Sequence, residues 1–337
     1  MPGAHPIRSE DDLIDRYLRP LTGNNTAARD LRDDAACLTP SAGQDLVMTK
    51  DALVAGVHFL PDDDAFAIGI KALTVNLSDL IAKGAEPVGY LLALALPPSI
   101  DTAWFERFAD GFGENGHGKL LGGDLTRTDG PIVVTVTAIG EVPHGRMVSR
   151  DGAGVGDQLF LSGPIGTSYV GLQYARDIPI AKRHGLDASE VHELVTAYAA
   201  PLIPFASDVW PLVRTYASAA LDVSDGLIRD AGRLLAASGV GAEVDAAAVP
   251  LHPTIQRLVD AGHINLRDLF TGGDDYRVLM TVPQRRLAEF SEAANSGLAQ
   301  FHAIGEITTG AELIVRDPTG ARMVFDDTGH DHFGGGR

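Results

Sequence analysis

The sequence of 337 residues contains a single cysteine, Cys37. One thiol excludes an internal disulfide and a zinc site built from cysteines, and it favours a reducing compartment. Basic residues are also few: Lys and Arg number 27 against 45 for Asp and Glu, which gives a net charge of −18. This charge argues against nucleic acid and against an anionic membrane surface as partners. A phosphate ligand would therefore need metal cations between it and the protein.

Long apolar runs are missing as well. The longest, residues 90–98, is too short to span a bilayer, and residues 1–12 are polar and acidic, without the apolar stretch of a signal peptide. We therefore expect a cytoplasmic protein with no membrane contact. The sequence also lacks a Gly-x4-Gly-Lys-Ser/Thr loop, a His-Glu-x-x-His pair and a Gly-x-Ser-x-Gly elbow. These absences argue against P-loop, zinc-peptidase and serine-hydrolase chemistry.

The length predicts two domains, and periodicity places strands and helices in both. Apolar residues recur at helical spacing in 65–82, and branched and small residues alternate along 131–142. Strand pairs that look antiparallel favour an α+β fold, with mixed or antiparallel sheets covered by helices, over a doubly wound sheet. Glycines without periodicity fill 143–157, so we place the domain boundary there and expect domains at 1–145 and 146–337.

Other elements follow from the same patterns. We expect further strands at 45–50, 89–96, 120–121, 158–162, 219–223, 276–282, 301–307 and 312–316. We expect helices after the cap residue Asp101, at 168–176, 189–199 and 205–217, and after 224–226. Gly111-x-Gly113-x-x-Gly116 matches a dinucleotide-binding pattern on paper. It follows a helix rather than a strand, so it does not predict a nucleotide site.

Aspartates beside Gly, Ser or Thr recur along the chain. They stand in Asp33-Asp34, in Thr49-Lys50-Asp51 at a strand end, at Asp79 in an apolar helix, in Gly122-Gly123-Asp124 after a strand, in Asp222-Val223-Ser224-Asp225-Gly226 and in Gly272-Gly273-Asp274-Asp275. Carboxylates suit Mg²⁺, although each one alone is also typical of a cap or a turn. Asp79 stands out because its neighbours predict an inward-facing position, where a carboxylate needs a partner such as a metal.

These segments form an ordered series. The series is DDAA at 33–36, TKDALVAGVHF at 49–59, KALTVNLSDLIAKGA at 71–85, GGDLTR at 122–127, SRDGAGVGD at 149–157, DVSDGLIRD at 222–230, GGDDY at 272–276 and HDHFG at 330–334. From about residue 14 to 333 the chain resembles the thiamine-monophosphate kinases, in the superfamily of aminoimidazole-ribonucleotide synthetase and selenophosphate synthetase. GVHF after the TKD strand and the DHF ending favour the thiamine branch.

The resemblance implies ATP-dependent phosphorylation of thiamine monophosphate to thiamine diphosphate by in-line, Mg²⁺-assisted transfer. It implies an N-terminal domain that binds ATP and several Mg²⁺ ions and pairs into a homodimer, and a C-terminal α/β domain that completes the active site. The metal positions that it implies are Asp34, Thr49, Lys50, Asp51, Asp79, Asp124, Asp222 and Asp225. The nucleotide positions are Gly123, Asp124, Arg150 and Ser224, and the thiamine monophosphate positions are His58, Asp274 and His330.

Four residues depart from the family pattern. Lys50 stands where Thr or Ser is usual, and because an ammonium cannot coordinate a metal, either its backbone carbonyl binds there or its side chain meets a phosphate. Asp274 replaces a Glu and shortens the reach by one methylene. His330 replaces an aromatic residue that packs on the thiamine ring, and Arg32 replaces a glycine.

The implied reaction needs no general base. A phosphate monoester has a second pKa of about 6, so the acceptor is mostly dianionic at neutral pH. Catalysis is then mainly positioning and charge neutralisation, and we expect no catalytic acid or base among the residues. Two alternatives stay open: an ATP-dependent ligase or synthetase of the same superfamily, and a non-catalytic sensor of Mg²⁺ or nucleotide.

Overall fold

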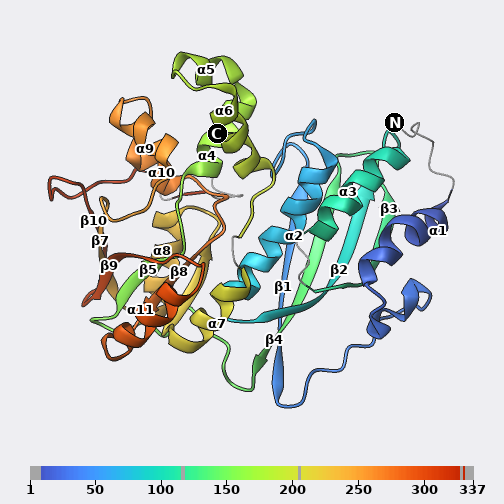
Figure 1. Cartoon of the computed structure of the whole chain (residues 1–337), viewed down its shortest axis with the longest axis horizontal. Coiled ribbons are helices and arrows are strands. Elements are labelled where there is room, and N and C mark those ends of the chain that lie inside the picture. The colour runs from blue at the N-terminus through green and yellow to red at the C-terminus, as the bar shows by residue number, and fades with distance from the viewer. Residues whose placement is uncertain (1–8, 115–117, 204–205, 327–328, 331–337) are drawn as a thin grey trace. The chain divides into compact units, whose positions relative to one another are not determined.

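The computed structural model describes residues 9–114, 118–203, 206–326 and 329–330. They form two compact units, one of Met1–Leu80 with Ala85–Gly145 and one of Ile81–Gly84 with Arg146–Arg337 (Figure 1). Each unit has its own sheet and its own helices. Both sheets mix parallel and antiparallel neighbours, which confirms the predicted α+β class.

The first unit is built on a four-stranded sheet in the order β1-β4-β2-β3. β1 (Gln44–Val54) and β2 (Glu86–Leu96) both pair antiparallel with β4 (Val133–Pro143), and β2 pairs parallel with β3 (Leu120–Arg127). Short helical turns precede the sheet. These are α1 (Glu10–Leu13), η1 (Ile14–Leu18), η2 (Arg19–Thr22) and η3 (Thr26–Leu31).

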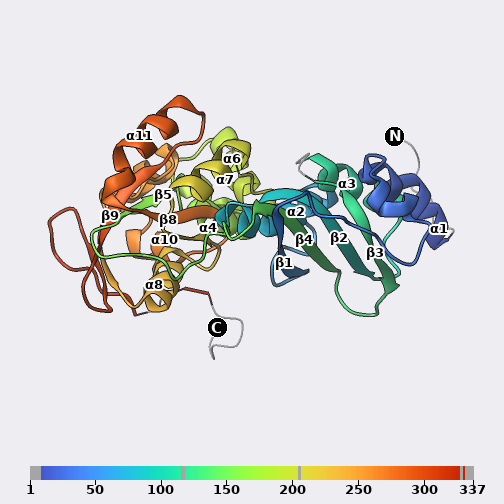
Figure 2. The ribbon, with the colours of Figure 1, turned by 90° about the horizontal axis from the view of Figure 1, so that it is seen from below.

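Two helices, α2 (Ala65–Ala82) and α3 (Thr102–Glu114), cover one face of this sheet (Figure 2). α2 has the predicted bounds, and α3 begins after Asp101, whose side chain accepts a hydrogen bond from the Trp104 N–H at 2.9 Å. The helices approach closely at Gly111, where a Cβ would lie 2.0 Å from the Phe66 carbonyl oxygen. Gly111 is therefore a packing residue; Gly116 lies outside the described residues.

Within the described residues, α2 is long and apolar enough to cross a membrane by length and composition alone. However, 83% of its 18-residue window is buried inside the protein. A helix that is apolar on all sides is also typical of a domain core, which is the position that α2 takes here.

The opposite face of the four-stranded sheet is more exposed. Along β4 the residues alternate strictly between buried and half-buried positions, as expected when one face packs against helices. On the more exposed face, the side chains of Met48 on β1 and Leu91 on β2 are 63% and 38% exposed.

The second unit contains a six-stranded sheet in the order β10-β7-β9-β5-β8-β6. Its strands are β5 (Gln158–Leu161), β6 (Ala219–Val223), β7 (Gly241–Asp245), β8 (Arg277–Val282), β9 (His302–Thr308) and β10 (Leu313–Arg316). Only the β10–β7 pair among them is parallel.

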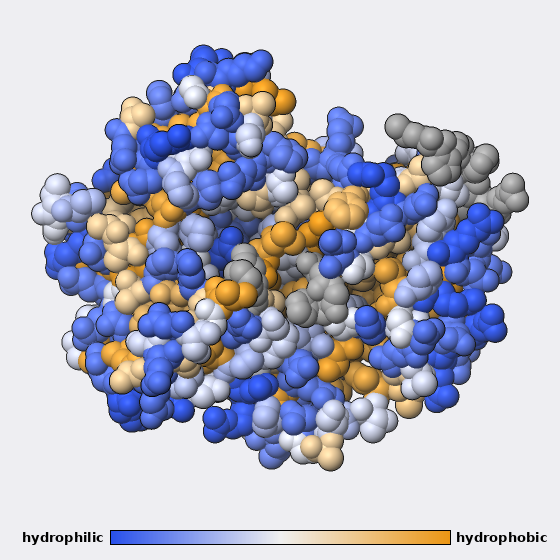
Figure 3. Space-filling view, viewed as in Figure 1, coloured by the Kyte–Doolittle hydropathy of each residue, from blue (hydrophilic) through white to orange (hydrophobic). Residues whose placement is uncertain are grey.

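The helices of the second unit lie between these strands in the chain. They are α4 (Thr167–Arg176), α5 (Ile178–Arg183), α6 (Ala188–Ala199), α7 (Ala206–Tyr216), α8 (Leu227–Ser238), α9 (Pro253–Asp260), α10 (Leu266–Thr271) and α11 (Leu287–Ser296), with a turn η4 at Gln284–Arg286. Hydrophilic side chains predominate over α5 and α6 on the face drawn in Figure 3. A buried cluster of apolar residues from its strands and helices forms the core of this unit.

Two expectations about strand ends are wrong. The Thr49-Lys50-Asp51 segment lies inside β1, and Gly122-Gly123-Asp124 lies inside β3. Long pairing explains both cases, because β1 runs beside β4 over its whole length and β3 continues beside β2 as far as Arg127. Tertiary pairing therefore overrides the turn preference of Gly and Asp.

Candidate functional site

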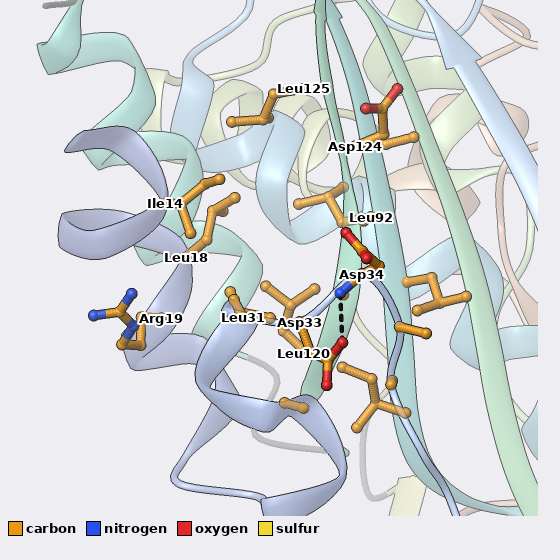
Figure 4. Close-up of a pocket in the computed structure, with 18 of the residues that line it drawn as sticks. Ile14, Leu18, Arg19, Leu31, Asp33, Asp34, Leu92, Leu120, Asp124 and Leu125 are labelled. Carbon is orange, nitrogen blue, oxygen red and sulfur yellow. Dashed lines mark hydrogen bonds between the residues drawn. The ribbon is translucent and has the colours of Figure 1, made fainter. Parts of the chain in front are cut away.

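A pocket of about 1160 Å³ opens on the sheet of the first unit (Figure 4). The N-terminal helical turns and the start of β3 form one wall of this pocket. Apolar side chains of these segments point into the pocket. The apolar residues labelled in Figure 4 are Ile14, Leu18, Leu31, Leu92, Leu120 and Leu125. Asp33 and Asp34 enter from the segment after η3, where the Asp33 carboxylate accepts a hydrogen bond from the Asp34 N–H at 2.8 Å.

Four of the residues proposed from the sequence line this one pocket. They are Asp34, Lys50, Gly123 and Asp124, and all four are exposed. Their backbones come from three separate segments, which only the sheet brings together. The pocket therefore combines an apolar wall with several charged side chains, because Glu10, Asp11, Asp15, Arg19, Arg32 and Asp33 also line it.

Thr49 and Asp79 form a second group in the first unit. The Thr49 hydroxyl on β1 donates a hydrogen bond to the Asp79 carboxylate on α2. Asp79 is half-buried rather than fully buried, and the Thr49 hydroxyl is one partner of its carboxylate. The backbone N–H of Asp51 donates to the side-chain oxygen of Asn76, also on α2, at 3.1 Å.

The alternation of β1 separates Lys50 from Thr49. Successive strand side chains point to opposite faces, so the Thr49 and Asp51 side chains share the face toward α2. Lys50 instead lines the pocket on the other face. The structure thus brings Thr49 together with Asp79, and Lys50 together with Asp34 and Asp124.

His58 lies in the turn after β1. The Nδ1 atom of its ring accepts a hydrogen bond from the Val54 N–H at 3.0 Å. The backbone N–H of His58 donates to the Val54 carbonyl at 2.9 Å. Because Nδ1 is an acceptor, the neutral ring carries its proton on Nε2. The loop therefore fixes both the position and the tautomer of His58.

In the second unit, the loop after β6 holds Ser224 and Asp225. Both backbone N–H groups donate to one oxygen of the Asp230 carboxylate, at 3.0 and 2.9 Å. Arg233 donates to the Asp225 carboxylate at 2.6 Å and to the other oxygen of Asp230 at 2.8 Å. Asp222 lies just before this loop, half-buried in β6.

The two substrate residues proposed in this unit hydrogen-bond to the same loop. The Asp274 N–H donates to the Ser224 carbonyl at 2.8 Å, and the His330 N–H donates to the Asp225 carbonyl at 3.1 Å. Ser224, Asp225, Asp274 and His330 are thus brought together through the backbone. Arg150 is exposed, and its carbonyl accepts a hydrogen bond from Ser238 at 3.0 Å.

The segment around Asp274 has strained backbone. Asp274 and Tyr276 have φ angles of 70° and 51°, in the left-handed region that favours glycine. The Tyr276 hydroxyl donates to the Asp274 carboxylate at 2.8 Å, and the Tyr276 N–H donates to the Val223 carbonyl at 2.8 Å. Such strain is typical of functional sites, where the surrounding structure holds it in place.

No group of three or more His, Cys, Asp or Glu side chains in the described part of the chain is placed to hold a metal ion. Of the proposed ligands, Asp34 and Asp124 line the same pocket, and Thr49 contacts Asp79 on the other face of the sheet. The roles proposed for individual site residues stay predictions.

Comparison with known proteins identifies the family. Residues 32–142 match the family described as AIR synthase related protein, N-terminal domain, and residues 154–318 match its C-terminal domain. A thiamine-monophosphate kinase from Caulobacter vibrioides is 38% identical over 340 residues, covering 96% of this chain and 91% of that protein. The chain belongs to the thiamine-monophosphate kinase family.

Solved structures of thiamine-monophosphate kinases have the same fold. The crystal structure of the enzyme from Stenotrophomonas maltophilia K279a has a TM-score of 0.75 and 35% identity, covering 85% of this chain and 89% of that one. The structure described as AaThiL complexed with AMPPCP and TMP has a TM-score of 0.72 and 30% identity, covering 88% and 89%. The expected two-domain aminoimidazole-ribonucleotide-synthetase-like fold is thereby confirmed.

Some residues that shape the site of this thiamine-monophosphate kinase family member were missed from sequence. The apolar wall of the pocket includes Ile14 and Leu18, whose four-residue spacing was the available signal. Asp230 was quoted only as part of a motif, although an aspartate in the first turn of a helix often accepts N–H groups there. Tyr276 gave no signal, because its contact with Asp274 depends on unusual backbone angles.

Asp275, the neighbour of Asp274, is 4% exposed and accepts hydrogen bonds from the Gly166 N–H at 2.7 Å and the Ser168 N–H at 3.4 Å. Burial raises its pKa from 3.8 to about 7, although these donors and the charge of Arg277 oppose the rise. The folded protein therefore binds this proton more tightly than the unfolded chain. Its stabilising contribution is complete below about pH 4 and is lost as the pH rises to about 7.

We therefore expect the Asp275→Asn variant to become more stable relative to wild type as the pH rises from about 4 to about 8. Urea unfolding at several pH values measures the difference in free energy. Asp317→Asn is the control, because a hydrogen bond from Thr319 lowers the pKa of Asp317, so that its contribution is lost only as the pH falls into the acid range. A pH-independent difference for Asp275→Asn would contradict the prediction.

Proposed function

We propose that this chain transfers the γ-phosphoryl group of ATP to thiamine monophosphate and releases thiamine diphosphate and ADP. The pocket of the first unit carries the proposal, because it joins an apolar wall to Asp34, Lys50 and Asp124. The names of the relatives and the AMPPCP and TMP complex of a family member support this choice of substrates.

The pocket suits a nucleotide in two parts. Its apolar wall, which includes Ile14, Leu18 and Leu31, offers a surface for a flat base. Its carboxylates, among them Asp34 and Asp124, are suited to the phosphates together with their metal ions. A pocket of about 1160 Å³ also has room for a molecule of this size.

The donor atoms fit Mg²⁺. Carboxylate and hydroxyl oxygens are the ligands that it prefers, and it commonly binds through only one or two carboxylates together with substrate phosphates. The contact of Thr49 with Asp79, and the presence of Asp34 and Asp124 in one pocket, agree with such sites. When bound, Mg²⁺ neutralises the charge of the phosphates. We propose that Asp51, Asp222 and Asp225 also serve as ligands.

Lys50 reaches a phosphate oxygen in this proposal rather than a metal. Its side chain lines the pocket, and an ammonium group donates hydrogen bonds but accepts none. Gly123, Arg150 and Ser224 contact the nucleotide, with the Arg150 guanidinium able to donate two parallel hydrogen bonds to a phosphate.

Thiamine monophosphate contacts His58, Asp274 and His330. The Nε2–H of His58 is oriented as a donor by the hydrogen bond that its Nδ1 accepts from Val54. Asp274 is positioned by the Tyr276 hydroxyl. The acceptor phosphate is already anionic, so these residues bind and orient the substrate and no residue removes a proton from it.

We also propose a cytoplasmic homodimer that pairs through the more exposed face of the four-stranded sheet. Met48, which does not line the nucleotide pocket, exposes its apolar side chain there, which favours burial against a second copy. Light scattering of the purified protein tests this, since a monomer at micromolar concentration would contradict it.

The decisive experiment measures ADP release from MgATP with and without thiamine monophosphate, with chromatography of the products. Equal amounts of ADP and thiamine diphosphate are expected. ADP release without thiamine diphosphate would favour a ligase or synthetase, and ATP binding without turnover would favour a sensor.

A further inference from the structure

Asp230 is a buried carboxylate with an unusual set of partners. Its side chain is 2% exposed and lies in the first turn of α8. One oxygen accepts the N–H groups of Ser224 and Asp225, and the other accepts a hydrogen bond from Arg233. A carboxylate is rarely buried to this degree unless its acceptor positions are satisfied, so these contacts account for its placement.

The loop of residues 224–225 makes hydrogen bonds through both its backbone N–H groups and its carbonyl groups. Its N–H groups point to Asp230, while its carbonyl groups accept the backbone N–H groups of Asp274 and His330. Ser224 and Asp225 are proposed to contact the nucleotide and the metal. The carbonyl groups of the same two residues therefore hold the backbone of Asp274 and His330, which are proposed to contact thiamine monophosphate. A displacement of this loop would move both sets.

We propose that Asp230 is a positioning residue that holds the 224–225 loop through its two backbone hydrogen bonds, and so sets the affinity for both substrates. This inference rests on the proposed function. Asp230 itself contacts neither substrate. Its pairing with Arg233 is secondary, because Arg233 is 40% exposed and is shared with Asp225.

Two substitutions separate the hydrogen bonds from the ion pair. Asp230→Asn keeps an oxygen that can accept both N–H groups and loses the charge that pairs with Arg233. Asp230→Glu keeps the charge, but its extra methylene moves the carboxylate away from the position that accepts both N–H groups. Arg233→Met removes the cation from both Asp230 and Asp225 and leaves the two backbone hydrogen bonds to Asp230 in place.

The test measures the binding of a non-hydrolysable ATP analogue with Mn²⁺ by calorimetry, below the melting temperature of each variant. We expect Asp230→Glu to weaken this binding by about tenfold or more, as losses of outer-shell partners commonly do. Asp230→Asn and Arg233→Met are expected to stay within about threefold of wild type. If Asp230→Glu binds like wild type, or if Asp230→Asn and Arg233→Met lose as much affinity as Asp230→Glu, the proposal is overturned.

Steady-state kinetics adds a readout that general destabilisation would not produce. Asp230→Glu should raise KM for both ATP and thiamine monophosphate, whereas His330→Ala should raise KM mainly for thiamine monophosphate. A rise confined to one substrate in Asp230→Glu would also overturn the proposal. If wild type binds the analogue but does not phosphorylate thiamine monophosphate, the proposed function fails, while the binding comparison still decides the role of Asp230. If wild type does not bind the analogue, both fail.

Discussion

The Asp79→Asn variant is expected to lose turnover by about a hundredfold or more while keeping its fold. Asp79 lies on α2 opposite Thr49, and its carboxylate supplies negative charge at a proposed Mg²⁺ position. Asparagine retains an oxygen for the Thr49 hydroxyl, so the helix and strand should stay in contact. It lacks the charge, and a neutral amide is a weaker ligand for a hard cation.

Turnover, melting temperature and Mn²⁺ affinity distinguish this effect from a folding defect. Asp110→Asn provides the matched control, since Asp110 is an exposed aspartate on α3 of the same unit. It should behave like wild type in all three measurements. Near-normal turnover of Asp79→Asn would remove Asp79 from the proposed metal site.

The Gly123→Ala variant should lose several kcal/mol of stability, above the usual range of about 1–3 kcal/mol for overpacking. A Cβ at this position would lie 1.8 Å from the Leu92 carbonyl oxygen, which belongs to the neighbouring strand. The atoms that it would meet are backbone atoms of Leu92, which cannot move aside as a flexible side chain can, so β3 must separate from β2. Because Asp124 is the next residue on β3, nucleotide affinity should fall with stability.

Gly122→Ala is the control for this substitution. A Cβ there would lie 3.5 Å from the Leu91 side chain, an ordinary contact distance. Urea unfolding should therefore find Gly122→Ala within about 1 kcal/mol of wild type. Equal stability of the two variants would show that β3 can shift enough to accommodate a methyl group at Gly123.

The hydrophobic periodicity of the sequence is sufficient to predict the bounds of an element that is long or clearly capped. The bounds of α2 were predicted from apolar spacing alone, and Asp101 marked the start of α3. The strand at 219–223 was also found with its observed bounds. In these cases local preference and tertiary packing favour the same structure.

Other elements depended on contacts that a single sequence does not contain. The short strand β7 is completed by pairing with β9 and β10, and α9, α10 and α11 are amphipathic helices of ten residues or fewer in polar surroundings. The sequence predicted a set of candidate site residues, but not their division between the two faces of the four-stranded sheet. Strand alternation already places Thr49 and Lys50 on opposite faces of the strand predicted at 45–50, but only the structure shows that the face of Lys50 carries the pocket.

The alternation along β1 also bears on how this sequence can change over evolution. A replacement at position 50 alters the pocket, yet it leaves the hydroxyl–carboxylate contact on the reverse side of the strand untouched. An insertion or deletion of one residue would instead exchange the two sides for every later position in the strand. Point substitutions at position 50 should therefore affect the pocket alone, whereas length changes within 44–54 should disturb both faces of the strand and be strongly selected against.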